Sequence, residues 1–312
     1  MEEAGSKYVD YIAVEKLISE KLQHAHHAPS GRQVNDRFDD FAAVPPFPAD
    51  LRERTHGGEG EQTFISAVDS GYKENDLVRS RIFRAQRSRG AVLFLHGLFE
   101  ENLLIYKFYF SQLNALGLDV HVMLLPFHYE RKPQTSAFSG EFFWSGDIDR
   151  SALAYKQAVY DAWRLYNHIK KTADRPVLLN GFSMGGGVAL TLATLAELDA
   201  LFVINPVCNF PDLIWNRRLF STIKADLERA GISLETIVRR LAHFDPINGS
   251  PQQANTAVAF GLYDQVSAQQ NYDLLINAWH PHVLPMHAGH LNILRVPRLA
   301  QEASDWYARM TS

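Results

Sequence analysis

The sequence has few of the features that mark disulfide-bonded, membrane-spanning or secreted proteins. Cys208 is the single cysteine among 312 residues, so no disulfide can form within the chain, and such cysteine usage suits a reducing compartment. The first residues lack the basic and apolar regions of a signal peptide. No apolar stretch reaches the ~18 residues that indicate a membrane span. We therefore expect a cytoplasmic protein without an integral membrane span.

The sequence also has no large excess of basic or acidic residues and no clear metal-binding motif. The formal net charge is −4, from 31 basic and 35 acidic residues, and no dense basic block occurs, which argues against nucleic acid as a partner. His24, His26 and His27 have no Cys or acidic residue at metal-site spacing, so we interpret them as a solvated helix end. The run Gly185-Gly186-Gly187 lacks the Lys-Ser/Thr of a phosphate-binding loop. We predict no metal and no cofactor.

The hydrophobic content of 46% allows a sizeable core without metals or disulfides. Residues 1–60 are predicted to form an N-terminal helix over 8–24, followed by an extended wrap with little regular structure over 25–60. Apolar residues recur in the helix at roughly helical spacing, namely Tyr8, Tyr11, Ile12, Val14, Ile18 and Leu22. We expect this helix to pack on a main domain that covers residues 61–312.

From residue 62 onward, strand-like and helix-like segments alternate. The expected strands are 63–68, 76–83, 91–95, 118–125, 176–180, 200–204, 255–261 and 282–286. The expected helices are 103–116, 148–172, the segment after Ser183, 266–279 and 297–310. This alternation predicts an α/β fold with a mostly parallel sheet and helices on both faces.

The alternation breaks between residues 205 and 254. This insert holds helix-compatible pieces around 211–229 and 233–242, with Trp215, Leu219 and Phe220 expected to be exposed. A long insert in a compact α/β domain often covers a site, so we predict a helical lid or cap and, with it, possible peripheral contact with lipid. The alternative is a pair of packing helices with no gating role.

A nucleophile elbow is predicted at residues 177–187. The run reads Val177-Leu178-Leu179-Asn180-Gly181-Phe182-Ser183-Met184-Gly185-Gly186-Gly187. In such an elbow a sharp strand-to-helix turn exposes a serine hydroxyl. The glycines on either side of Ser183 are expected because the turn is strained and neighbouring backbone approaches closely.

A serine nucleophile needs a base and an acid that orients the base. Asp264 and His290 follow Ser183 in the chain, and each lies just beyond the carboxyl end of a predicted strand, where catalytic groups collect. We predict Asp264 as the acid, with Asp245 and Asp212 of the insert as alternatives. We predict His290 as the base.

His287, which lies three residues before His290 and also near the strand end, is the alternative base. The other histidines, His121 and His128 among them, are expected to be structural or surface residues.

An oxyanion hole needs backbone N–H groups that point to the developing negative charge. Met184, directly after the nucleophile and at a helix N-terminus, is the first predicted donor. The second should come from the loop that follows the strand 91–95, which reads His96-Gly97-Leu98-Phe99. We predict Leu98, with Phe99 as the alternative.

These motifs, in this order along the chain, resemble those of the serine-type α/β-hydrolases. The resemblance covers residues of about 62 to 310. The residues that carry the resemblance are His96-Gly97, Gly181-Phe182-Ser183-Met184-Gly185, Gly261-Leu262-Tyr263-Asp264 and Gly289-His290. The resemblance implies an eight-stranded, mostly parallel sheet whose second strand is antiparallel. It also implies acyl transfer through a covalent intermediate on Ser183.

The aromatic segment 126–145 follows the carboxyl end of a strand, so we expect it to line an apolar pocket. Phe99, Phe127, Phe143, Trp144 and Trp215 are the predicted substrate-binding residues. Arg131 and Lys132 in this segment are expected to be solvated loop charges.

The predicted function is that of a serine hydrolase of the carboxylesterase, lipase or thioesterase type, acting on a small-molecule carboxylic ester or thioester. The alternatives are an acyltransferase that uses the same triad and a catalytically silent binding protein on the same fold. The sequence does not indicate the oligomeric state.

Overall fold

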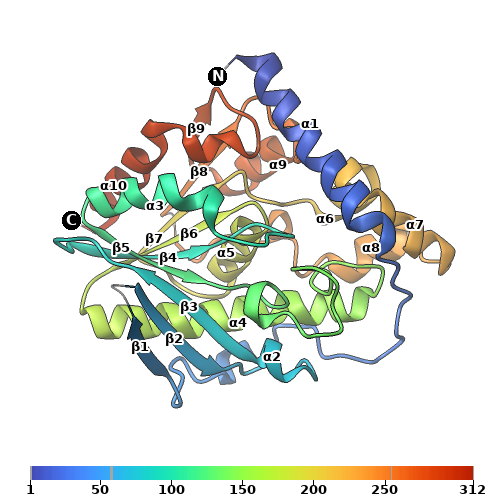
Figure 1. Ribbon diagram of the computed structural model, residues 1–312, viewed down its shortest axis with the longest axis horizontal. Helices are drawn as coiled ribbons and strands as arrows, with labels where there is room; N and C mark the ends of the chain where they lie inside the picture. Colours follow the sequence, from blue (N-terminus) through green and yellow to red (C-terminus); the bar gives the residue numbers. More distant parts are fainter. Residues whose placement is uncertain (1, 57–58, 254, 312) are drawn as a thin grey trace.

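In the computed structural model, which describes residues 2–56, 59–253 and 255–311, nine strands form one sheet through the centre of the molecule (Figure 1). The strands are β1 Arg52–His56, β2 Glu59–Ile65, β3 Leu77–Phe83, β4 Gly90–Leu95, β5 Leu118–Met123, β6 Val177–Phe182, β7 Ala200–Ile204, β8 Thr256–Gly261 and β9 His282–Met286. Strands β4 and β6 to β8 are fully buried, because helices cover both of their faces.

The strand order is β1-β2-β3-β5-β4-β6-β7-β8-β9. Strand β3 runs antiparallel to both of its neighbours, whereas β5, β4 and β6 to β9 are parallel. The chain leaves β4 for β5 on one side and later returns to β6 on the other side. The carboxyl ends of β4 and β6 therefore meet at a topological switch point, where ligands bind in open α/β sheets.

The sheet has one strand more than the eight that were predicted. Strand β1 pairs antiparallel with β2, with Arg52 opposite Thr63, and it lies in the segment predicted to be an irregular wrap. Its sequence, Arg-Glu-Arg-Thr-His, shows no apolar alternation because it forms the edge of the sheet. Charged side chains are common on edge strands, where they discourage pairing with another chain.

The helices pack in two layers against the sheet (Figure 1). The α-helices are α1 Glu3–Glu20, α2 Lys73–Asp76, α3 Lys107–Ala115, α4 Ile148–Ala173, α5 Met184–Leu195, α6 Phe210–Asn216, α7 Ser221–Arg229, α8 Leu234–Leu241, α9 Gln269–Trp279 and α10 Pro297–Thr311. The short 3₁₀ helices are η1 Leu22–His24, η2 Phe41–Ala43, η3 Leu104–Tyr106, η4 Tyr129–Arg131, η5 Arg218–Phe220, η6 Pro246–Asn248 and η7 Asn292–Arg295. One apolar core lies between the sheet and α4 and α5, and the other lies between the sheet and α3 and α10.

Only part of the predicted apolar residues of the N-terminal helix face the main body: Val14 and Ile18 of α1 are buried, as is Leu22 in η1. The buried stripe is Ser6, Asp10, Val14 and Ile18. Tyr8, Tyr11 and Ile12, which were expected to face the body, are 65%, 57% and 43% exposed. The two buried polar side chains have partners in the loop that the helix covers: Asp10 accepts the backbone N–H groups of His290 and Leu291, and Ser6 accepts from the side chain of Asn292.

The insert between β7 and β8 folds as the short helices α6, η5, α7, α8 and η6. The predicted helix over 211–229 is interrupted at Arg217, which is extended with φ −95° and ψ 135°. Of the three side chains predicted to be exposed, Phe220 is buried and Trp215 and Leu219 are half-buried. The Phe220 ring packs edge-on against Trp144 of the body, with the ring centroids 6.2 Å apart. The insert therefore packs closely on the body.

Arg131 is fully buried, although a solvated loop charge was expected. Its Nη2 donates to Oδ2 of Asp161 at 2.8 Å, and both side chains are 0% exposed. Its other donors bind the carbonyl oxygens of Asn75 and Leu124 at 2.8 and 2.9 Å. This pair ties the loop after β5 to α4, and removal of either partner would leave a buried charge uncompensated.

Candidate active site

Ser183 lies at a sharp turn between β6 and α5. Its backbone has φ 53° and ψ −117°, a strained conformation for a residue with a side chain. A Cβ at Gly181 would lie 2.4 Å from the carbonyl oxygen of Gly185, and one at Gly185 would lie 2.2 Å from that of Leu95. Both glycines are therefore required by close backbone approach, as the elbow motif predicted.

The structure brings Ser183, His290 and Asp264 into one hydrogen-bonded chain. The Ser183 Oγ lies 2.9 Å from Nε2 of His290, and Nδ1 of His290 lies 2.7 Å from Oδ2 of Asp264. A carboxylate only accepts hydrogen bonds, so Nδ1 carries the proton in the neutral ring and Nε2 accepts from the serine hydroxyl. This is the arrangement in which a histidine can take the serine proton.

Asp264 is held in place by three donors besides His290. The backbone N–H groups of Val266 and Ser267 donate to Oδ1 at 2.7 and 3.0 Å. The hydroxyl of Tyr272, on α9, donates to Oδ2 at 2.6 Å. The sequence analysis missed Tyr272, because a tyrosine in a helix eight residues after the acid carries no distinguishing pattern.

The environment of His290 favours the protonated ring. Burial by itself lowers the pKa of His290, but the adjacent Asp264 carboxylate opposes this, with smaller contributions from Asp10 and Glu100, and the net pKa lies above its ordinary value. An imidazolium at this position is therefore stabilised.

The alternative acids and base lie elsewhere. Asp245 accepts from the N–H groups of Asn209, Phe210 and Ile247 at 2.9, 2.7 and 3.3 Å, as a capping residue does. Asp212 binds Arg217 at 2.9 Å. His287 is exposed, and its Nδ1 lies 2.9 Å from the Tyr263 hydroxyl. None of the three forms a described hydrogen bond with Ser183 or His290.

Two backbone N–H groups beside Ser183 are open to an oxyanion. Among the described hydrogen bonds, none uses the N–H of Met184 or of Leu98. Phe99, the alternative donor, has φ 62° and directs its N–H to Nε2 of His128 at 3.2 Å. That N–H is already used, so Leu98 is the better candidate.

Two buried histidines fix the loop that carries Leu98. Nε2 of His96 accepts the N–H of Leu125 at 2.9 Å, and its Nδ1 lies 2.7 Å from the carbonyl oxygen of Gly97. Nδ1 of His128 donates to the carbonyl oxygen of Pro126 at 2.8 Å, which leaves Nε2 as the acceptor for Phe99. Burial lowers the pKa of His128 to about 4, so the neutral ring needed for this role prevails at pH 7. The sequence analysis assigned His128 no role beyond a structural or surface one.

Glu100 lies in the same loop as Leu98, and its carboxyl was not predicted to belong to the site. Tyr129 donates to its Oε2 at 3.1 Å, and the Tyr106 hydroxyl donates to its Oε1. The Tyr106 hydroxyl in turn accepts the N–H of Gly97 at 2.8 Å. Burial raises the pKa of Glu100 to about 8. The sequence shows only a polar residue after a strand, which is an ordinary loop feature.

A pocket of about 130 Å³ opens beside Ser183. Its walls come from α1, the loop after β4, the elbow, the insert and the loops that carry Asp264 and His290. The lining residues are Asp10, Ala13, Val14, Leu17, Gly97, Leu98, Glu100, Ile105, Phe182, Ser183, Leu219, Val266, His290 and Leu291. Apart from two carboxyls and the serine and histidine, the lining is apolar.

The aromatic residues predicted to bind substrate do not line this pocket. Phe99, Phe127, Phe143 and Trp144 are at most 4% exposed and belong to the core that packs on α4 and α5. Trp215 packs at the edge of that core. The segment 126–145 folds inward, and its aromatic rings contact one another.

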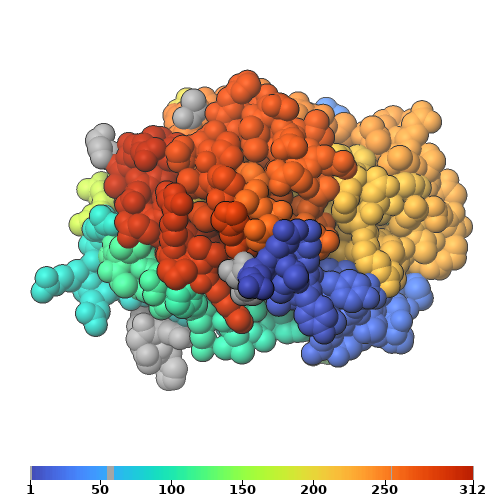
Figure 2. Space-filling view, turned by 90° about the horizontal axis from the view of Figure 1, so that it is seen from above, coloured from blue at the N-terminus to red at the C-terminus, as the bar shows by residue number. Residues whose placement is uncertain are grey.

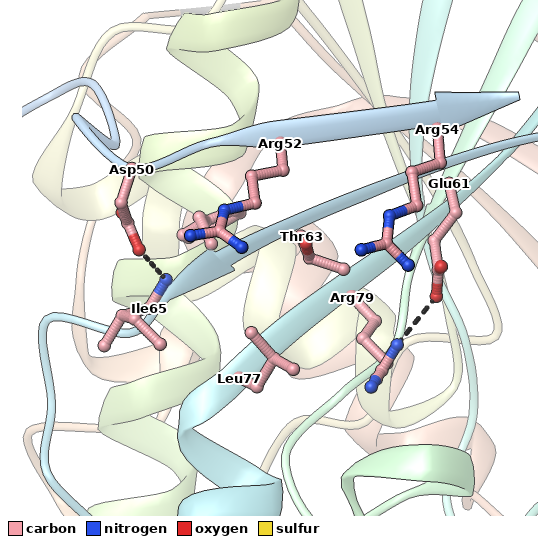
Figure 3. A pocket seen from close by; sticks show the side chains of 9 residues that line it. Asp50, Arg52, Arg54, Glu61, Thr63, Ile65, Leu77 and Arg79 are labelled. Atoms are coloured by element: carbon pink, nitrogen blue, oxygen red, sulfur yellow. Dashed lines mark hydrogen bonds and ion pairs between the residues drawn. The ribbon is translucent and has the colours of Figure 1, made fainter.

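A larger pocket of about 350 Å³ lies at the β1 edge of the sheet, on β1 to β3. Arg52, Arg54 and Arg79 extend over it, and Arg79 pairs with Glu61 (Figure 3). It shares no lining residue with the pocket at Ser183 and contains no serine, cysteine or histidine. It therefore lacks a nucleophile with a base.

In the described part of the chain, no group of three or more His, Cys, Asp or Glu side chains could hold a metal ion. His26 and His27 instead approach Asp226 and Glu141, each at 3.1 Å. Over the same residues, no helix is long and apolar enough to cross a membrane.

Solved structures with the same fold are esterases and other hydrolases. Acetyl xylan esterase 1 from Thermoanaerobacterium sp. JW/SL YS485 matches with a TM-score of 0.62 and 16% identity, over 92% of this chain and 98% of that one. The acetyl xylan esterase from Paenibacillus sp. R4 gives 0.60 and 16%, over 90% and 98%. An S-formylglutathione hydrolase from Agrobacterium tumefaciens gives 0.56 and 14%, over 84% and 100%.

No family model matches the sequence, and no curated protein matches it either. The structural matches nevertheless cover most of this chain and nearly all of each neighbour. The chain therefore has the α/β-hydrolase fold, as its motifs predicted.

Proposed function

We propose that the protein is a serine hydrolase that cleaves carboxylic esters or thioesters with short, apolar acyl groups. The observation that carries the proposal is the chain of hydrogen bonds from Asp264 through His290 to Ser183, at 2.7 and 2.9 Å, on the wall of an apolar pocket. A serine hydroxyl is a weak nucleophile until a positioned base takes its proton.

In the proposed reaction Oγ of Ser183 attacks the acyl carbon while its proton passes to Nε2 of His290. Asp264 orients the ring and stabilises the imidazolium. The negative charge on the carbonyl oxygen is bound by the N–H groups of Met184 and Leu98. The imidazolium then protonates the leaving alcohol or thiol. Water, deprotonated by His290, attacks the acyl-enzyme, releases the carboxylic acid and restores the Ser183 hydroxyl.

The size of the pocket supports a short acyl group. Its volume of about 130 Å³ is close to that of a ~150 Å³ apolar cavity that binds benzene, so it fits about six non-hydrogen atoms. The structural neighbours are named for acetyl and formyl groups, which agrees with this size.

Labelling with a fluorophosphonate tests the proposal directly. The wild-type protein should be labelled at one site, and Ser183→Ala should not be labelled. Ser111→Ala, which removes an exposed serine hydroxyl on α3, should be labelled like the wild type. An unlabelled wild type, or labelling that persists in Ser183→Ala, would contradict the proposal and favour a binding protein.

A panel of nitrophenyl esters with two to twelve acyl carbons then measures the acyl preference. We expect kcat/KM to be highest at six carbons or fewer and to fall steeply beyond. A preference for the longest acyl chains would contradict the short-chain assignment.

A further inference from the structure

Asp10 lies on α1, far in sequence from the candidate triad, yet its carboxylate contacts the loops that carry it. Oδ2 accepts the backbone N–H of His290 at 2.6 Å and that of Gln265 at 3.2 Å, and Oδ1 accepts that of Leu291 at 3.1 Å. The side chain is fully buried. One carboxylate thus joins the loop of the candidate base to the loop of the candidate acid.

A second set of contacts joins α1 to the loop that carries His290. The Ser6 hydroxyl, one turn before Asp10, accepts from Nδ2 of Asn292 at 3.0 Å, and Oδ1 of Asn292 accepts the N–H of Gly289 at 2.6 Å. A Cβ at Gly289 would lie 2.6 Å from Oδ2 of Asp10. The helix therefore fits closely against the loop that holds His290.

The same face of α1 continues into the pocket. Ala13, Val14 and Leu17 follow Asp10 at helical spacing and line the pocket together with Ser183. Ile105, Leu219 and Val266 also line the pocket. Figure 2 shows α1 on the surface, between the C-terminal part of the chain and the insert. Pocket residues are thus covered by a helix that lies outside the α/β part of the chain.

We propose that α1 completes the active site, with Asp10 positioning His290 and with Val14 and Leu17 limiting the length of the acyl group. This inference rests on the proposed function of Ser183. Asp10 touches no reacting atom, so it is a positioning residue. It acts through the backbone of His290 and through its negative charge.

Because Asp10 is charged, it should also affect the pKa of His290, which an uncharged structural contact would not do. The acidic groups that face His290 are Asp264 from the loop after β8, Glu100 from the loop after β4, and Asp10 from α1, and each favours the protonated ring. Loss of the Asp10 charge should therefore lower the pKa of His290. The acid limb of the pH profile of kcat/KM would then move to lower pH.

The variant Asp10→Asn keeps the side-chain shape but removes the charge and one acceptor. We expect kcat to fall about 10- to 100-fold with KM changed less than about threefold, since a small displacement of a catalytic group is costly. The acid limb of the pH profile of kcat/KM should also move to lower pH. Glu3→Gln, which removes an exposed acidic residue of the same helix, should match the wild type in both respects.

Ser6→Ala provides a milder test in case Asp10→Asn does not fold. It removes one hydroxyl from the same contact and leaves Asp10 in place. We expect kcat to fall about threefold to tenfold with an unchanged acid limb. A kcat within about 1.5-fold of the wild type in Ser6→Ala, or an Asp10→Asn protein that behaves like Glu3→Gln, would overturn the positioning role.

The variants Val14→Ala and Leu17→Ala test the pocket wall. Each removes two or three carbons, so the ester of highest kcat/KM should become longer by about two carbons. Ile12→Ala, on the exposed face of the same helix, should leave the preference unchanged. If all three variants prefer the same acyl length as the wild type, the role of α1 in acyl selection is overturned. A wild type that fluorophosphonate does not label would instead refute the proposed function itself.

Discussion

The hydroxyl of Tyr272 and the ring of His290 donate to the same oxygen of Asp264, at 2.6 and 2.7 Å. The other carboxylate oxygen accepts two backbone N–H groups. Asp264 therefore has four donors, and its carboxylate plane is fixed relative to the imidazole. Burial raises the pKa of Tyr272 well above its ordinary value, so the phenol stays a neutral donor across the working range of pH.

Replacement of Tyr272 by Phe should shift the pH dependence of activity. Without the phenol, more of the carboxylate charge acts on His290, so the pKa of His290 rises and the acid limb of kcat/KM moves to higher pH. The unfolding free energy should fall by about 1–3 kcal/mol, as expected for the loss of a hydrogen bond to a charged group. Rate profiles from pH 5 to 9 and urea unfolding measure the two effects.

Tyr263→Phe is the matched control, because the Tyr263 hydroxyl contacts His287 at 2.9 Å on the surface. It should leave the profile unchanged. An acid limb that stays in place in Tyr272→Phe, or that moves equally in both variants, would contradict the coupling between Tyr272 and His290.

Replacement of Asp264 by Asn should reduce kcat by as much as ~10⁴-fold while the protein stays folded, as for triad acids elsewhere. Asp245→Asn is the informative comparison. Asp245 caps three backbone N–H groups, so its loss should lower the melting temperature and leave kcat within about threefold. Steady-state kinetics and thermal unfolding of the two variants distinguish the roles, and the opposite pattern would make Asp245 the acid.

The kcat/KM of the wild-type protein should rise with pH, because only the neutral ring of His290 acts as a general base. Its pKa lies above the ordinary value of ~6.5 once the Asp264 carboxylate outweighs burial. We therefore expect the inflection of kcat/KM above pH 6.5. Initial rates measured across pH 5–9 check this, and a flat profile would argue against His290 as the base.

The features that could be predicted from the sequence are those that depend on local chemistry. The strand-to-helix turn at Ser183 needs glycines at 181 and 185, and both the motif and the resulting backbone follow from steric contact. Asp264 and His290 could be predicted because parallel strands bring their carboxyl ends to one edge of a sheet. The fold class and most element boundaries followed from the same alternation of patterns.

The residues that were missed depend on contacts between distant segments. Asp10 lies 280 positions before His290, and helical periodicity alone predicted that Tyr8, Tyr11 and Ile12 would be buried instead. Strand β1 consists of polar residues and forms only because an edge is available for pairing. The aromatic residues of 126–145 showed that a pocket or a core was near, but periodicity cannot distinguish the two. The one local signal for Asp10 was its spacing of four and eight residues from Val14 and Ile18, which places the three on one face of the helix.

Replacement of Gly97 by Ala should disturb the candidate oxyanion loop. A Cβ there would lie 2.8 Å from Oε1 of Glu100 and 3.2 Å from the Phe182 ring, so either the Glu100 carboxyl, which Tyr106 and Tyr129 hold, or the loop that carries Leu98 must shift. We expect kcat to fall about 10²-fold with KM little changed, comparable to the loss of one oxyanion donor. The matched control is Gly5→Ala, an exposed glycine that has no atom within 4 Å of the new Cβ and should keep kcat. A Gly97→Ala variant with wild-type kcat would place the oxyanion elsewhere.

Glu100 should make the protein less stable as the pH rises. Burial raises the pKa of Glu100 to about 8, against ~4.3 in an unfolded chain. Between these values the folded state binds a proton that the unfolded state has lost. The unfolding free energy therefore falls by up to about 1.4 kcal/mol per pH unit on account of this group. Glu100→Gln removes the titration, so its unfolding free energy should depend less steeply on pH between about 5 and 7.5.

Urea unfolding at several pH values measures this difference, and Glu101→Gln is the control. Glu101 is the next residue and 47% of its side chain is exposed, so its replacement should leave the slope of the wild type unchanged. Parallel stability curves for Glu100→Gln and the wild type would mean that Glu100 is ionised in the folded protein and that Tyr106 and Tyr129 offset its burial.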